Sequence, residues 1–119
     1  MSPSEKTLAF QITTKERSIL FDMLGTANSK TLTDGVTLKS GRMTIHEIIG
    51  FAETYTFIVF LAESVALPLG TGLVASYIYD KLKSKPDAKL KIGKVDVRID
   101  EGEIKRIILE NLELTENKA

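Results

Sequence analysis

The chain has 119 residues, and its 16 basic and 16 acidic side chains leave no net charge. This length predicts a single domain over residues 1–119, and the charge balance argues against a nucleic-acid partner. Because cysteine is absent, disulfides, thiolate metal sites and a cysteine nucleophile are excluded. The first ten residues lack the basic and long apolar regions of a signal peptide, so we expect a cytoplasmic protein, with a membrane location as the alternative.

The N-terminal part of the chain predicts a strand and then a short helix. Residues 8–12 alternate between apolar residues and polar or small ones, at the two-residue period of a half-buried strand. Thr13 and Glu16 have the spacing of a capping box, and Gly25 favours a helix end after the apolar residues that follow. Residues 1–6 are expected to form a flexible tail.

A turn-rich segment comes next. Asp34 and Gly35 suit a type I′ turn, because both tolerate a positive φ angle. They predict a small hairpin over residues 31–38, with a mobile loop as the alternative.

The block over residues 43–79 contains no lysine or arginine. Thr44 and Glu47 have the spacing of a second capping box, and the apolar residues after them face every direction around a helix axis. Pro68 interrupts this pattern, and helical spacing then resumes up to Lys83. The block therefore predicts a central apolar helical hairpin.

A membrane span within residues 45–79 is the alternative. A span needs about 20 apolar residues, and the block is long enough. Glu53 and Glu63 lie inside it, however, and each acid costs roughly 2.5 to 3.5 kcal/mol in lipid. We therefore prefer a helical hairpin buried in protein.

The C-terminal part predicts a hairpin and a helix. Gly93 and Lys94 form the turn of the hairpin over residues 89–98, whose apolar residues then share one face. The pairs expected across it are Ile92 with Val95, Leu90 with Val97, Lys91 with Asp96 and Lys89 with Arg98. Asp100 and Glu103 cap a final amphipathic helix, and residues 113–119 are expected to form a second tail.

These elements predict an α+β fold. A small antiparallel sheet, made of the N-terminal strand and the 90–99 hairpin, packs against the central apolar helical hairpin and the C-terminal helix. Lysine and arginine outnumber acids in the stretch from residue 81 to residue 98. We interpret this excess as a solvated hairpin face, with contact to phosphates or lipid headgroups as the alternative.

Candidate catalytic and metal-binding residues are few. His46 is the single histidine, and Glu53 lies on nearly the same helical face, but two ligands do not make a metal site. Glu53 and Glu63 are about 80° apart around a helix, so they are not an obvious acid–base pair. Their roles stay open between functional carboxylates and surface positions. We expect no enzymatic activity, no metal and no cofactor.

The layout resembles the effector-associated constant components, which are small accessory domains of bacterial conflict systems. The residues that carry this resemblance are Gly41-Arg42-Met43 and Gly70-Thr71-Gly72, the latter leading into residues 73–78. Tyr77 or Tyr79 stands where those domains often have tryptophan. The resemblance implies a bacterial adaptor that recruits a protein partner near a membrane, and it implies no catalytic residues.

The surplus of apolar residues predicts a non-enzymatic protein-interaction or adaptor module that self-associates. Phe51, Tyr55 and Ile58 are expected to form the patch buried in a symmetric homodimer. We also expect a further protein partner, whose identity stays open. The alternative function is a small membrane-inserted or membrane-associated protein, regulatory or pore-forming, that uses the apolar block 45–79.

Overall fold

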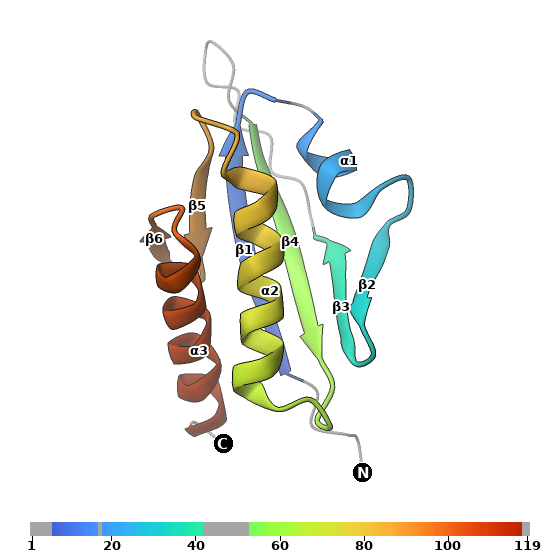
Figure 1. Cartoon of the computed structure of the whole chain (residues 1–119), viewed down its shortest axis with the longest axis vertical. Helices are drawn as coiled ribbons and strands as arrows, with labels where there is room; N and C mark the ends of the chain where they lie inside the picture. The colour runs from blue at the N-terminus through green and yellow to red at the C-terminus, as the bar shows by residue number, and fades with distance from the viewer. Residues whose placement is uncertain (1–5, 17, 42–52, 118–119) are drawn as a thin grey trace.

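The computed structural model describes residues 6–16, 18–41 and 53–117, with side chains up to Leu112. These residues form an α+β fold in which three helices lie on one face of a six-stranded antiparallel sheet (Figure 1). The strands are β1 (Lys6–Thr14), β2 (Ser29–Thr33), β3 (Val36–Ser40), β4 (Glu53–Leu61), β5 (Lys89–Ile92) and β6 (Val95–Val97). The helices are α1 (Ile19–Leu24), α2 (Leu67–Leu82) and α3 (Glu101–Asn117). The predicted fold class is confirmed.

The strands lie in the order β2-β3-β4-β1-β5-β6, so β4 and β1 are central and β2 and β6 are the edges. Figure 1 shows α2 over the central strands, α3 on the side of β5 and β6, and α1 on the side of β3. Alternate residues of each strand point toward this helical layer, because the side-chain period of a strand is two. We call the side facing the helices the inner face and the other side the outer face.

The inner face and the helices enclose one hydrophobic core. In the two central strands the buried apolar residues are Leu8, Phe10, Ile12, Tyr55, Phe57, Val59 and Leu61. The rings of Phe10 and Phe57 stack at its centre with 5.3 Å between their centroids. α3 adds Ile104, Ile108 and Leu112 at helical spacing, as the sequence predicts.

The prediction of a long helix over residues 44–67 is wrong where the structure describes the chain. Residues 53–61 form β4, whose side chains are alternately buried and half-buried. This run consists largely of β-branched and aromatic residues, which favour a pleated surface. Because β4 has a hydrogen-bonded neighbour on each side, the absence of charged residues after Glu53 reflects a central strand. The capping pair Thr44 and Glu47 lies outside the described residues.

The central helical hairpin is therefore a single helix, α2, which begins at Leu67 and passes through the predicted break. Pro68 lies in the first turn, where its missing N–H costs no hydrogen bond. Gly70 is buried, and a Cβ there would lie 2.8 Å from a methyl of Val65 and 3.0 Å from a methyl of Leu61. A glycine at this position lets the start of α2 pack closely on the end of β4.

Both hairpins are present. Gly35 has a φ of 86° in the β2–β3 turn, and Gly93 has a φ of 62° in the β5–β6 turn. The predicted register of the second hairpin is confirmed for Ile92 with Val95, Leu90 with Val97 and Lys91 with Asp96. β6 ends at Val97, so the ladder does not reach the expected pair of Lys89 with Arg98.

The helix ends agree only in part with the sequence patterns. Thr13 stays within β1, and α1 starts later with Ser18 as its N-cap, so the predicted first capping box is wrong. The predicted cap of α3 is confirmed, because the Glu103 amide donates to the Asp100 carboxylate over 3.0 Å. α3 also includes residues 113–117, which the sequence pattern assigned to a tail.

Candidate functional site

Two of the three residues predicted to form a self-association patch, Tyr55 and Ile58, lie on opposite faces of β4. Phe51 lies outside the described residues. Tyr55 is only 4% exposed on the inner face, and its hydroxyl donates to the Glu53 carboxylate over 2.7 Å. Ile58 is three positions further along β4, so its side chain lies on the outer face, where it is half-buried.

No cluster of three or more metal-ligating side chains occurs among the residues that the structure describes. His46 lies outside them. Glu53 begins β4 and Glu63 follows its end, which separates the two carboxylates by more than roughly 25 Å along the strand. These two acids are therefore not brought together.

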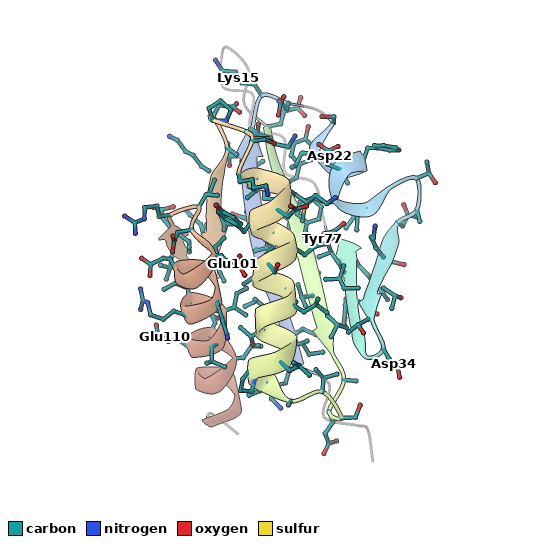
Figure 2. The ribbon with its side chains drawn as sticks, in the orientation of Figure 1. Lys15, Asp22, Asp34, Tyr77, Glu101 and Glu110 are labelled. Carbon is teal, nitrogen blue, oxygen red and sulfur yellow. The ribbon has the colours of Figure 1, made fainter. Side chains whose placement is uncertain are left out.

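A cluster of charged and aromatic side chains joins α1 to the C-terminal half of α2 (Figure 2). The Tyr77 hydroxyl donates to the Met23 carbonyl over 2.5 Å. Lys85 lies 2.8 Å from Asp22 and 3.1 Å from Glu16, and its hydrogen bond to Asp22 is the main cause that raises the pKa of the lysine. Burial is the main cause that raises the pKa of Tyr77. These contacts hold the short helix α1 against the rest of the fold. Both pKa shifts follow from this packing and do not point to a catalytic role.

A groove of about 810 Å³ lies at the N-terminal end of α2. We call it the α2 groove, and it is lined by Thr33, Asp34, Ser64, Val65, Ala66, Pro68, Leu69, Gly70, Gly72, Leu73 and Lys105. Leu69 is 75% exposed and Leu73 is 37% exposed. Because they are four residues apart, the two leucines stand next to each other on the outside of α2.

The two flanks of the α2 groove carry opposite charges. Asp34 projects from the β2–β3 turn on one side of α2, as Figure 2 shows. Lys105 comes from α3 on the other side, and a Cβ at Gly72 would lie 3.7 Å from its Nζ atom. Neither Asp34 nor Lys105 forms an ion pair with a described residue.

A second surface is the outer face of the sheet, which no described helix covers. On β1, β3, β4, β5 and β6 its residues are Thr7, Ala9, Gln11, Thr13, Thr37, Lys39, Thr54, Thr56, Ile58, Phe60, Lys89, Lys91 and Asp96. Most of them are hydroxyl-bearing or basic. Lys39 lies over the ring of Phe60, with its Nζ atom 4.8 Å from the ring centroid.

One end of the outer face is hollowed into a pocket of about 320 Å³. We call it the lysine pocket, and it is lined by Gln11, Thr13, Thr54, Lys89, Leu90, Lys91 and Asp96. The ladder between β1 and β5 places Thr13 opposite Lys89 and Gln11 opposite Lys91. The hydroxyls of Thr13 and Thr54 share a hydrogen bond of 2.9 Å.

Sequence reasoning did not single out the residues that form either surface. The four-residue spacing of Leu69 and Leu73 was available, but their exposure depends on where α3 packs. The alternation of Lys89 and Lys91 within the hairpin indicated a shared face, and the sequence pattern assigned that face to solvent.

Within the described part of the chain, none of the helices is both long enough and apolar enough to cross a membrane. Comparison of the chain with protein-family models, with curated proteins and with solved structures found no match in any of the three. The resemblance to the effector-associated constant components stays a prediction.

Proposed function

We propose that this chain is a non-enzymatic protein-interaction module of the cytoplasm, and that it self-associates through the α2 groove. The observation that carries the proposal is the pair of exposed leucines, Leu69 and Leu73, between flanks of opposite charge. In an adaptor, the same dimer would present two copies of the remaining surface to a further protein partner.

Burial of the two exposed leucines favours association. Burying one leucine side chain contributes roughly 1.5 to 3 kcal/mol, and a symmetric dimer buries the same pair from both copies. Gly72 and Ser76 lie on the same exposed side of α2. Small side chains at these positions allow a second helix to approach closely.

The charges favour one arrangement of the two copies. A two-fold axis running along α2 brings the β2–β3 turn of one copy over α3 of the other. Asp34 then meets the partner's Lys105, and the contact occurs twice. A two-fold axis across α2 would instead oppose like charges, which is unfavourable.

The first experiment measures mass in solution. Sedimentation equilibrium at micromolar concentration should give twice the chain mass of 13.2 kDa. Leu73→Glu should give the single-chain mass with an unchanged far-ultraviolet circular dichroism spectrum. The control is Val95→Glu, because Val95 is 45% exposed but lies on β6, away from the α2 groove.

The second experiment tests the charge arrangement. Asp34→Lys should weaken the dimer, and Asp34→Lys combined with Lys105→Asp should restore it, because only the pairing between copies is recovered. The chain has no cysteine, so Leu73→Cys provides a single thiol near the proposed axis. It should form a disulfide-linked dimer on oxidation, whereas Val95→Cys should not. A wild-type chain that stays monomeric up to about 100 µM, a concentration where even weak dimers assemble, contradicts self-association.

A further inference from the structure

The lysine pocket lies on the opposite side of the sheet from the α2 groove, and it has the donors of an anion-binding site. Lys89 and Lys91 are two residues apart on β5, which places them roughly 6.6 Å apart along one face. No described carboxylate lies within ion-pair distance of either ammonium group.

The neutral groups of the pocket add further donors. In the hydrogen bond between Thr13 and Thr54, one hydroxyl donates, and the accepting hydroxyl keeps its own proton free to donate outward. The Gln11 side-chain amide lines the same pocket and can donate as well. Ammonium, hydroxyl and amide donors around a small pocket are suited to a carboxylate or a phosphate oxygen.

The outer face as a whole has the same sign of charge as the pocket. Its strand residues include three lysines and one acid, Asp96, although the whole chain has no net charge. The outer face is therefore positive relative to the remainder of the molecule. Charge complementarity requires an acidic partner there and disfavours the stacking of two outer faces on each other.

We propose that the outer face binds an acidic polypeptide segment of another protein, one carboxylate of which enters the lysine pocket. Asp96 stands opposite Lys91 and reduces the local charge of the pocket from two to one. A single positive charge matches a monovalent carboxylate better than a divalent phosphate group. None of the described residues that line the pocket is aromatic, so it has no platform on which a base could stack.

Lys39 provides a second anchor for the same segment. β3 and β5 are three strand spacings apart, which places Lys39 and Lys91 roughly 14 Å apart across the strands. An extended segment spans this distance with acidic residues about four positions apart. The segment crosses the strands and contacts the side chains of Thr56 and Ile58 between its anchors.

The test uses a fluorescein-labelled hexaglutamate peptide and measures anisotropy at low salt with the full chain. The peptide should bind to the wild type and be released as salt increases. Lys89→Glu should weaken binding at least about fivefold, because it replaces an attractive contact with a repulsive one. Lys83→Glu is the matched control, since it makes the same charge change at the end of α2, and it should leave binding nearly unchanged.

A gain of binding separates the proposal from a folding defect. Asp96→Asn removes the one acid of the pocket and should tighten hexaglutamate binding, an effect that misfolding does not produce. Leu73→Glu should bind the peptide as the wild type does, so a failure of self-association is distinguishable from a failure of this site.

Three results would overturn the proposal. The first is the absence of hexaglutamate binding at millimolar chain concentration. The second is an equal loss of binding in Lys83→Glu and Lys89→Glu, which would indicate only a general charge effect. The third is tighter binding of a labelled hexathymidylate with the same dependence on Lys89, which would assign the face to nucleic acid.

Discussion

The inner and outer faces of the sheet are formed by the same strands, but their side chains differ in burial and polarity. Along β4, the inner face carries Tyr55, Phe57, Val59 and Leu61, which are at most 4% exposed. The outer face of the same strand carries Thr54, Thr56, Ile58 and Phe60, all half-buried. Packing against α2 and α3 restricts the inner residues to apolar groups that fill the core. The outer residues are under no such restriction from the described helices, so lysines and hydroxyl-bearing residues are compatible with that face.

The largest effect that tests this comparison comes from two phenylalanines on one strand. Phe57→Ala should lower the free energy of unfolding by about 3 to 5 kcal/mol, because Phe57 is fully buried and stacked on Phe10. Phe60→Ala should lower it by about 1 kcal/mol, since it loses partial burial and the contact with Lys39. Urea denaturation measures both. Equal losses in the two variants would show that the outer face is packed as tightly as the inner one.

The sequence predicted the elements whose side-chain period was visible locally. The β5–β6 hairpin was placed in the correct register because Gly93 and Lys94 mark the turn and residues 90–97 alternate in step with it. The cap at Asp100 and the apolar stripe of α3 were also predictable, since both depend on spacing within a few residues.

The sequence pattern of β4 resembles that of a buried helix, because the outer face of the strand is apolar or neutral as well. With Ile58 and Phe60 between the buried residues, the strand has an almost continuous apolar run, and periodicity alone does not separate such a strand from a buried helix. The six-stranded order was not predictable either, because the pairing of β1 with β4 joins residues that are 39 (Thr14 and Glu53) to 55 (Lys6 and Leu61) positions apart.

The two surfaces were missed for a related reason. A site made by Leu73 and Lys105, or by Thr13 and Lys89, joins residues from separate elements. Such a site exists only because the strand order and the helix packing bring these elements together. Local sequence patterns carry no information on either. The Lys89–Lys91 spacing was visible, but the hydroxyls that complete the pocket come from β1 and β4.

A smaller effect on the inner side comes from Thr71, which is fully buried within α2. Its hydroxyl has no hydrogen-bond partner among the described residues. Thr71→Val keeps the shape of the side chain and removes the unsatisfied group, so it should raise the free energy of unfolding by about 1 kcal/mol. Thr37→Val on the outer face is the control, and it should change stability by less than about 0.5 kcal/mol. A destabilised Thr71→Val would mean that the hydroxyl is satisfied in solution.

The smallest effect concerns the point where the two layers join, at Asp87 between α2 and β5. Its carboxylate accepts hydrogen bonds from the Lys15 amide over 2.7 Å and from the Thr14 hydroxyl over 2.9 Å. The Lys15 amide is the main cause that holds the pKa of Asp87 below its ordinary value. Since this pKa is lower in the folded chain, the carboxylate stabilises the fold fully above about pH 3.9, and the contribution is lost as the pH falls through the folded value. Asp87→Asn should therefore melt at a lower temperature than the wild type at pH 7, and the difference should shrink on acidification toward pH 2. A constant gap between the melting temperatures of wild type and Asp87→Asn across the titration would contradict this role for Asp87.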